Sequence, residues 1–321
     1  MAIKGENAFF TLIRCDSDEG WREERRNGIG ASDMGAVMGL SPWRSPYEVW
    51  LEKTGRVEPD DISDRPVVAF GNDFEETAGR NFEKEHSGSR VRRVNAMCQS
   101  IERPFVRASL DFECTMPGRD GWGVLEVKTS RDRAGFEGRM LPAYVAQATQ
   151  QLYVTGRSWG VIWAFFRDTC EYGAYPVEPD ADDLKAVTDA ADSFWGFVER
   201  DEPPEMTGLE SEARALAEQH AEPGDEWEVG GKAEASLVSE LAEMGEAIKS
   251  MEGDRRRIQD RLKSAIGDSC GIEVPGYEVR WLRGQSSRFD RKAFERDHPE
   301  LAARYTTTAT RDMGLRVKAI G

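Results

Sequence analysis

Long apolar runs are absent from this sequence of 321 residues. No stretch approaches the ~20 apolar residues that a membrane-spanning helix needs. The first residues, Met-Ala-Ile-Lys-Gly-Glu-Asn, also lack the apolar segment of a secretory signal peptide. We therefore expect a protein that has no membrane partner and acts in the cytoplasm of the cell that makes it.

Cysteine and histidine are both scarce. The five cysteines lack the spacing of a zinc site or a redox pair, and lie at Cys15, Cys98, Cys114, Cys170 and Cys270. We predict buried thiols in a reducing compartment, without structural zinc or an iron–sulfur cluster, since an odd number also argues against a complete disulfide framework. The histidines stand apart as well, which disfavours a histidine-based mechanism: His86, His220 and His298.

The sequence also lacks a positive charge balance. Its net charge of −16 counts against a protein that coats nucleic acid with its whole surface. A locally basic channel for DNA stays compatible, because basic residues cluster at 22–26, 90–107 and 280–292. Such runs are most often solvated faces, so they decide nothing by themselves.

What the sequence does contain is a stretch, residues 109–128, that predicts two strands joined by a Pro-Gly-Arg-Asp-Gly turn. We expect Asp111 on the first strand, and Glu126 and Lys128 on the second. Residues two apart share one face of a strand, so Glu126 and Lys128 project together while the apolar residues on either side of Glu126 face a core. Alone, this pattern is most simply a surface hairpin with a Glu–Lys pair.

Two further polar side chains lie on helices predicted around this stretch. Glu75 falls in a helix over residues 67–85, and Gln147 in one over residues 142–155. Carboxylates such as Glu75, Asp111 and Glu126 suit Mg²⁺ or Mn²⁺, and two such ions can hold the attacking and leaving oxygens of a phosphodiester. Lys128 can orient or deprotonate a metal-bound water and offset charge on the phosphate.

The remaining pattern predicts an α/β (α+β) fold with a mixed central sheet flanked by helices. Strands are predicted over residues 90–98, 105–111, 124–129, 159–166 and 170–175. Residues 201–230 are rich in Glu, Pro and Gly. We therefore expect a first domain over residues 1–205, a linker over 206–232 and an accessory region over 233–321.

Apolar residues recur with heptad-like spacing in the accessory region. They predict a long helix over residues 233–266 whose seam has Arg255 in one slot and otherwise consists of Leu237, Leu241, Met244, Ile248, Met251, Ile258 and Leu262. This seam could pair within the chain, between subunits or with a partner. A small α+β tail is predicted after it, with a hairpin over 271–283, a helix over 290–305 and a strand over 314–320.

The order of the three acids and Lys128 resembles the PD-(D/E)XK restriction-endonuclease-like core. Four further motifs are similar to the YqaJ-type viral recombinase family, which includes phage lambda exonuclease: Arg-Asn-Gly-Ile-Gly-Ala-Ser-Asp (26–33), Leu-Ser-Pro-Trp-Arg-Ser-Pro (40–46), Gly-Asn-Asp-Phe-Glu (71–75) and Tyr-Val-Ala-Gln (144–147). The resemblance covers roughly residues 20–200. This ordered set is far more specific than a lone Glu-x-Lys.

The resemblance implies a nuclease with two Mg²⁺ or Mn²⁺ ions per site. It would degrade one strand of linear double-stranded DNA from the 5′ end and leave a 3′ strand for a phage single-strand annealing protein. It further implies a phage or prophage protein in a bacterial host. The chains would form a homo-oligomeric ring around the DNA, which we expect to be a trimer, with a tetramer as the alternative.

The resemblance also implies roles for single residues. The metal would be held by Glu75, Asp111, Glu126 and the carbonyl of Val127, with Lys128 acting on the water. The terminal or scissile phosphate would be held by Arg25, Ser32, Ser109 and Gln147. A guanidinium with hydroxyl and amide donors suits a phosphate.

Some choices within these sets stay open. Arg25 and Arg26 are adjacent, so either could grip the phosphate. Glu75 is preferred to Glu76 because of its spacing from the preceding motif residues. Leu110 stands where the family has a proline before the first Asp; that position shapes the backbone and is not a ligand.

Two other functions compete with the exonuclease. The same core could belong to an endonuclease, which would cut closed circular DNA. Alternatively, the protein could be a non-catalytic adaptor that binds DNA ends and carries a vestigial site. The presence of all three acids and the lysine in order argues against the adaptor.

Overall fold

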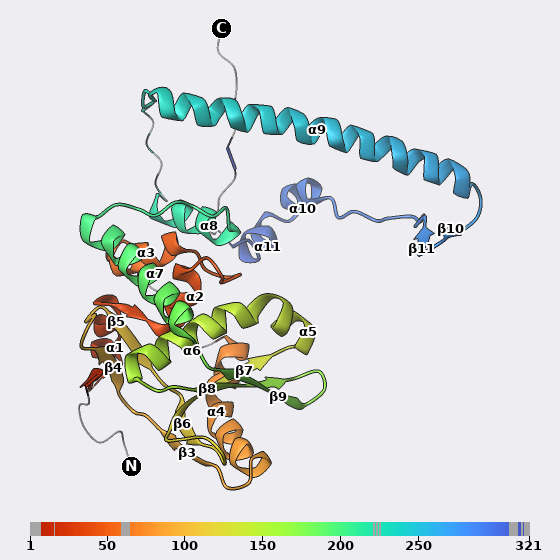
Figure 1. Ribbon diagram of the computed structural model, residues 1–321. Coiled ribbons are helices and arrows are strands. Elements are labelled where there is room, and N and C mark those ends of the chain that lie inside the picture. The colour runs from red at the N-terminus through yellow and green to blue at the C-terminus, as the bar shows by residue number, and fades with distance from the viewer. Residues whose placement is uncertain are drawn as a thin grey trace. The chain divides into compact units, whose positions relative to one another are not determined.

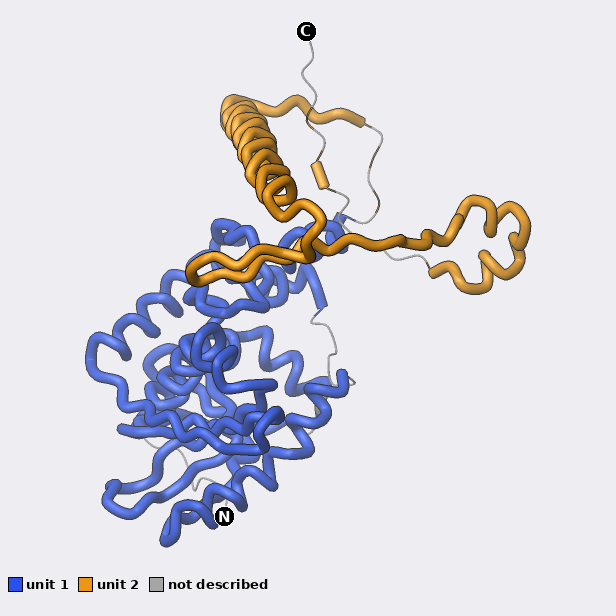
Figure 2. Tube along the Cα trace, turned by 90° about the vertical axis from the view of Figure 1, so that its right-hand side faces the viewer, with its two compact units in different colours: residues 1–220 blue, residues 221–321 orange. Residues whose placement is uncertain are grey.

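The computed structural model describes residues 8–15, 17–58, 65–220, 222, 224, 226–307, 314–315 and 317. The chain divides into two compact units, residues 1–220 and residues 221–321 (Figure 2). The first unit includes helix α8 (Glu210–Gln219), in the stretch expected to be a linker, because α8 packs on helix α3 (Pro46–Lys53). The separate roles assigned to the two parts of the chain stay a prediction.

Five strands form the larger sheet of the first unit, in the order β3-β6-β7-β8-β9 (Figure 1). β7 and β8 are parallel and the other neighbours antiparallel, which confirms the expected mixed sheet. The strands are β3 (Arg90–Arg93), β6 (Phe112–Thr115), β7 (Gly123–Ser130), β8 (Gly160–Phe166) and β9 (Glu171–Val177). β7 lies in the middle of the sheet, and this position explains its largely buried, apolar character.

Four strands form a smaller sheet, in the order β1-β4-β5-β2. They are β1 (Phe10–Ile13), β4 (Met97–Ser100), β5 (Val106–Ser109) and β2 (Ile29–Gly30). The single strand predicted over residues 90–98 is wrong, since β3 and β4 are separate strands of different sheets. The strand predicted over 105–111 ends early, at Ser109. The alternation of polar and apolar residues continues from β5 through Leu110 and Asp111, so it could not locate the end of this strand.

Helices cover both faces of the larger sheet (Figure 1). Leu125 and Val127 of β7 pack with Ala78 and Phe82 of helix α4 (Pro66–Glu85), which confirms the predicted apolar face. The opposite face, which carries Glu126, meets helix α6 (Leu141–Thr155). α6 ends at Gly156, whose φ of 67° is the left-handed conformation that glycine adopts most readily.

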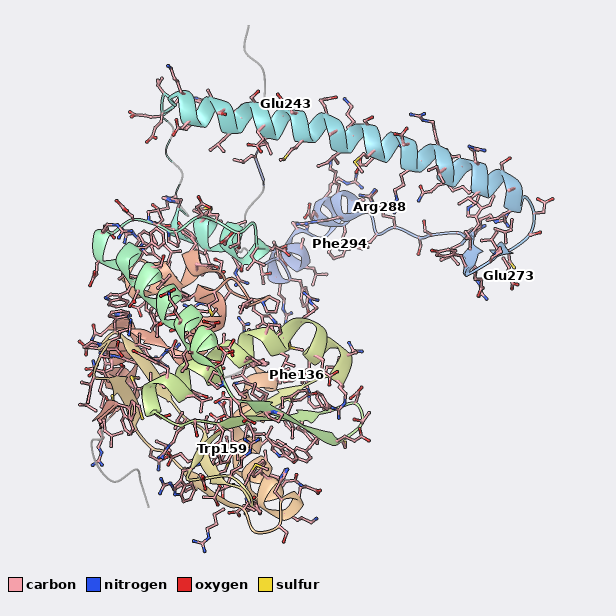
Figure 3. The ribbon with its side chains drawn as sticks, in the orientation of Figure 1. Phe136, Trp159, Glu243, Glu273, Arg288 and Phe294 are labelled. Atoms are coloured by element: carbon pink, nitrogen blue, oxygen red, sulfur yellow. The ribbon has the colours of Figure 1, made fainter. Side chains whose placement is uncertain are left out.

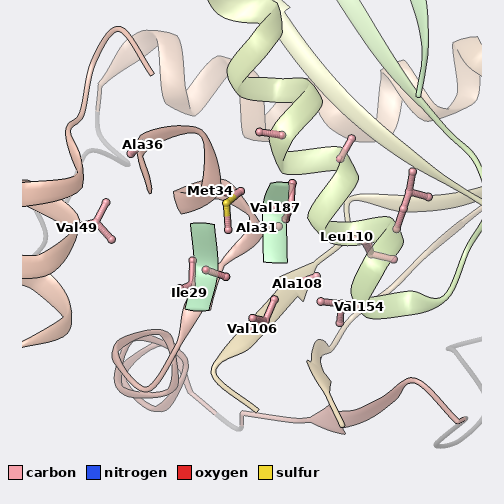
Figure 4. Close-up of a cluster of buried hydrophobic side chains, with 14 of the residues drawn as sticks. Ile29, Ala31, Met34, Ala36, Val49, Val106, Ala108, Leu110, Val154 and Val187 are labelled. Carbon is pink, nitrogen blue, oxygen red and sulfur yellow. The ribbon is translucent and has the colours of Figure 1, made fainter. Parts of the chain in front are cut away.

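The main core lies where α6 meets the smaller sheet and helices α2 (Ala31–Val37), α3 and α7 (Ala181–Arg200). Ile29, Met34 and Val187 are among the buried side chains there (Figure 4). Gly35 lets α2 approach α6, because a Cβ at this position would lie 2.7 Å from the Cβ of Ala143. The remaining helices are α1 (Asp18–Arg26), α5 (Arg133–Gly135) and a π-helical turn (Phe136–Met140).

The second unit begins with the long helix α9 (Lys232–Ile266). The hairpin β10 (Gly271–Val274) and β11 (Tyr277–Arg280) and the helices α10 (Arg291–Asp297) and α11 (Pro299–Arg304) follow. The single helix predicted over 290–305 is wrong, because Pro299 begins a new helix. The strand predicted over 314–320 is not formed at residues 314, 315 and 317, and its other residues lie outside the described ones.

Within the described ranges, no helix combines the length and apolarity needed to span a membrane.

Candidate active site

Glu126 and Lys128 of β7 lie just beyond the last residue of this strand that pairs with the neighbouring strand β6. The pairing of β6 with β7 stops at Phe112 opposite Leu125, whereas β7 continues to Ser130. Asp111 takes the place of the missing strand partner, because its Oδ2 accepts a hydrogen bond of 2.9 Å from the Val127 N–H. Asp111 therefore lies in the two-residue connection between β5 and β6, rather than on a strand as predicted.

Glu126 is buried and held from two sides. Only 1% of it is exposed, and Gln147 and Gln151 of α6 donate hydrogen bonds to its two oxygens, the latter at 2.7 Å. Lys128 forms an ion pair with the oxygen that Gln147 contacts. Gln151 was not predicted here, although its position one helical turn after Gln147 was a usable signal. It also donates to the Ser109 carbonyl at 3.0 Å, whereas Ser109 itself is exposed.

Lys128 lies between the carboxylates and the ring of Tyr144. Its Nζ is 4.8 Å from the ring centroid, within the range of a cation–π contact. Burial favours the neutral amine, but the charges of Glu126 and Asp111 outweigh it and raise the pKa of Lys128. Lys128 is consequently an ammonium that can donate hydrogen bonds to an anion.

Three carboxylates influence one another at this site. Burial, together with the charge of Glu126, raises the pKa of Asp111 to about 8. Burial and the charge of Glu126 also raise the pKa of Glu75. Arg93 forms an ion pair with Glu75 at 3.3 Å and partly offsets this rise. Glu76 is exposed, so the geometry favours Glu75 as the member of the cluster. Carboxylates that destabilise each other's charge are typical of functional sites.

The donor set fits a hard divalent cation. It offers carboxylate oxygens without sulfur or imidazole, and a cation would relieve the repulsion that raises the pKa of Asp111. Among the described residues, however, no three Asp, Glu, His or Cys side chains are already arranged as a metal cage. The N–H of Val127 is taken by Asp111, and its carbonyl stays a predicted ligand.

A cavity of about 470 Å³ lies next to this cluster, lined by residues of α1, α2, α3 and α8. Arg25 and Ser32 both line it. Ser109 and Gln147 are not among its lining residues, so the structure divides the predicted phosphate-binding set between two places. The ring of Trp43, in the cavity wall, is tilted against the ring of Tyr144 with 6.0 Å between their centroids. Since Tyr144 also contacts Lys128, these two rings connect the cavity wall to the carboxylate cluster.

A buried acid organises the cations of this cavity. Asp33 is 1% exposed and is contacted by Lys53 at 2.8 Å, Arg44 at 3.0 Å and Arg25 at 3.2 Å. Burial alone would raise the pKa of Asp33, but these cations hold this pKa far below its usual range. Asp33 thereby orients Arg25 toward the cavity. Arg26 instead pairs with Glu58 and does not line the cavity, which favours Arg25 as the phosphate ligand.

The first unit therefore has a mixed α/β fold with a cluster of carboxylates and one lysine where its central strand β7 extends beyond β6. Residues 20–158 match the family described as the YqaJ-like viral recombinase domain. This match confirms the resemblance to this family that the motifs indicate, over residues 20–158. The matched range contains all nine residues of the predicted site.

Other proteins are similar over different parts of the chain. The uncharacterized protein YqaJ of Bacillus subtilis (strain 168) is 25% identical over 291 residues, which cover 89% of each chain. An alkaline exonuclease from Laribacter hongkongensis is 18% identical, with a TM-score of 0.44 over 57% of this chain and 93% of that chain. A phage related exonuclease from Haemophilus somnus 129PT is 13% identical, with a TM-score of 0.37 over 54% of this chain and 96% of that chain. Likenesses this distant assign no activity to this chain.

Proposed function

We propose that this protein is a divalent-cation-dependent exonuclease that resects linear double-stranded DNA in the 5′-to-3′ direction and leaves 3′ single-stranded tails. The observation that carries the proposal is the cluster of Asp111, Glu126 and Lys128 where β7 extends beyond β6, within a YqaJ-like viral recombinase domain. Such a cluster supplies both the negative charge that binds cations and a cation that binds phosphate.

In this proposal Asp111, Glu126 and Glu75 hold Mg²⁺ or Mn²⁺. A bound cation of this kind lowers the pKa of water and neutralises charge on a phosphate. Gln147 and Gln151 keep Glu126 in one orientation, so that its oxygens need not reorganise during the reaction. Lys128 donates hydrogen bonds to the scissile phosphate from beside Tyr144.

The cavity at Arg25 and Ser32 would receive the 5′-terminal phosphate. Each acid that lines it already has a partner: Asp33 is paired with Lys53, Arg25 and Arg44, Glu52 with Arg44 and Lys53, Glu58 with Arg26, and Glu218 with Arg214, while Glu48 accepts hydrogen bonds from the Ser45 N–H and the Ser211 hydroxyl. The remaining parts of the proposal follow the family. They are two cations per site, a ring of three or four chains around DNA, and delivery of the 3′ strand to a phage annealing protein in the bacterial cytoplasm.

Digestion of end-labelled DNA tests the proposed activity. With Mg²⁺ present, we expect linear duplexes to lose nucleotides from their 5′ ends while covalently closed circles persist. A chelator should stop the reaction. Cleavage of closed circles would indicate an endonuclease instead, and binding of ends without cleavage would indicate a DNA-end adaptor.

Replacing Arg25 by alanine should reduce kcat/KM on 5′-phosphorylated ends by about tenfold more than on 5′-hydroxyl ends. The reason is that a guanidinium–phosphate contact exists only with the phosphorylated end. Arg26→Ala is the matched control, because Arg26 is adjacent but does not line the cavity. Equal losses on both kinds of end in Arg25→Ala would contradict the assignment.

A further inference from the structure

Helix α9 exposes an apolar seam along its whole length. It is one continuous helix of 35 residues, about 52 Å long at 1.5 Å per residue. The seam side chains are exposed by 37% to 71%: Leu237, Leu241, Met244, Ile248, Met251, Ile258 and Leu262. Side chains project from all sides of α9, Glu243 among them (Figure 3). Of its described residues, Ile266 alone is buried.

This helix needs a partner for its stability. Gly245 and Gly253 stand in its interior, and a Cβ at either position would contact nothing within 4 Å. Each glycine costs about 1 kcal/mol relative to alanine in an exposed helix. Helices in proteins gain most of their stability from packing an apolar face, and the steps of three and four along the seam are those of a two-stranded coiled coil.

The charges of α9 are divided between its halves. Residues 232–249 carry two lysines and four glutamates, a net charge of −2. Residues 250–266 carry five basic and three acidic residues, a net charge of +2. A second copy of the helix that runs in the opposite direction places each acidic half against a basic half, whereas a parallel copy places like halves together.

Arg255, the charged residue in the seam, also favours the antiparallel arrangement over the parallel one. In a parallel pair each Arg255 would face its counterpart, and two like charges would be buried side by side. In an antiparallel pair with its axis between Lys249 and Ser250, Arg255 faces Met244 of the second copy, within its acidic half. Arg255, Arg261 and Glu240 have no ion-pair partner in the described part of the chain.

The antiparallel arrangement also brings every apolar seam residue to a seam partner. With the axis between Lys249 and Ser250, Leu237 faces Leu262 of the second copy and Leu241 faces Ile258. Ile248 faces Met251, next to the axis. On the flank of the seam, Glu240 falls beside Arg261 of the second copy, an opposite-charge pair at the position that selects partners in coiled coils.

We propose that α9 pairs with α9 of a second copy of this chain as an antiparallel coiled coil. This contact is separate from the proposed nuclease activity and from any contact between nuclease domains. It has twofold symmetry, so both copies use the same surface. A twofold contact cannot be satisfied for every chain within a ring of three, and in a trimeric protein it would therefore join one ring to another.

Disulfide trapping in the full-length protein tests the direction of the pair. The prediction of buried thiols is wrong for Cys170 and Cys270, which are exposed, and Cys15 is half-buried. These three are first changed to serine, and differently tagged Leu237→Cys and Leu262→Cys chains are then co-expressed and oxidised. We expect a disulfide between the two kinds of chain and little between chains of the same kind. Predominant disulfides between like chains would indicate a parallel pair and overturn the proposal, as would the absence of any cross-link.

A charge reversal in the seam tests the contact without cysteines. Arg255→Glu places a carboxylate beside Met244 in the acidic half of the second copy and should weaken association by at least about tenfold, because the new negative charge then lies among the glutamates of that half. In sedimentation at micromolar concentration its mass should fall to half that of the unaltered protein. Arg256→Glu, which changes the charge equally but points away from the seam, should keep the full mass. Equal masses for both variants would refute the pairing.

Discussion

Replacing Lys128 by methionine is expected to lower the rate of DNA cleavage by about 10²- to 10³-fold, the usual cost of removing one donor that stabilises developing charge. Lys128 is the cation paired with Glu126, and its ammonium is held over the ring of Tyr144. Methionine preserves most of the apolar stem but cannot donate a hydrogen bond to a phosphate. Glu126 keeps its two glutamine donors in this variant, so the fold should persist.

Two measurements separate loss of chemistry from loss of structure. Circular dichroism and thermal unfolding should show a folded Lys128→Met protein, and titration calorimetry with Mn²⁺ should still detect cation binding, because the carboxylates are intact. Lys84→Met, an exposed change on α4, serves as the control and should cleave normally. A Lys128→Met enzyme with undiminished cleavage would refute the role given to this lysine.

The alternation of residues along β7 was sufficient to predict its two faces. Val127 and Leu125 are buried beside α4, whereas Glu126 and Lys128 share the other face. The alternation of side chains with a period of two is a property of the strand alone. It can therefore be predicted without knowing which elements lie beside the strand. The helices beside the site were predictable for the same reason, since the limits of α6 follow from Pro142 at its start and Gly156 at its end.

The position of Asp111 could not be predicted in this way. Its pattern continues that of β5, yet the chain leaves one sheet at Ser109 and enters the other at Phe112. Asp111 lies in the connection and bonds to the backbone of β7. The sheet that a strand joins depends on pairing with residues far away in the sequence, so it cannot be predicted from the local pattern of residues.

The contacts among the residues that line the cavity could not be predicted from the sequence pattern either. Asp33 stands in the first turn of α2, where its Oδ2 accepts a hydrogen bond from the Gly30 N–H at 3.2 Å. The role of Asp33 comes from Lys53 and Arg44, which α3 and the preceding loop bring to it. A buried acid with three cations is recognisable only once the helices that carry them are packed together.

Changing Asp111 to asparagine is expected to abolish cleavage and yet to stabilise the protein in the absence of divalent cations. Burial and the charge of Glu126 raise the pKa of Asp111 to about 8, whereas an unfolded Asp ionises near pH 3.9. Between about pH 4 and pH 8 the unfolded chain therefore releases a proton that the folded chain keeps. Stability must fall across this interval as the pH rises, because the folded state binds more protons.

Asparagine cannot ionise, and its side-chain oxygen can still accept the hydrogen bond from Val127. We expect Asp111→Asn to be more stable than the unaltered protein by about 5 kcal/mol at pH 8 without divalent cations, and equally stable at pH 4, since each unit of pKa difference corresponds to about 1.4 kcal/mol. In thermal unfolding this corresponds to a rise in Tm of about 10–20 °C. Asp73→Asn, an exposed change on α4, should have little effect on Tm at either pH.

Addition of Mg²⁺ should then narrow the difference in stability between the two proteins. The unaltered chain gains stability by binding the cation through an ionised Asp111, since a ligand that binds only the folded state stabilises it. The asparagine variant gains little, because it has lost one of the carboxylates that hold the ion. A variant that is less stable than the unaltered protein at pH 8 without Mg²⁺ would show that Asp111 is stabilising as a carboxylate, contrary to its place beside Glu126. Asp111 thus destabilises the folded protein when no cation is bound, but it is needed for the proposed cation site. Asp111→Asn should therefore raise stability without divalent cations and abolish cleavage.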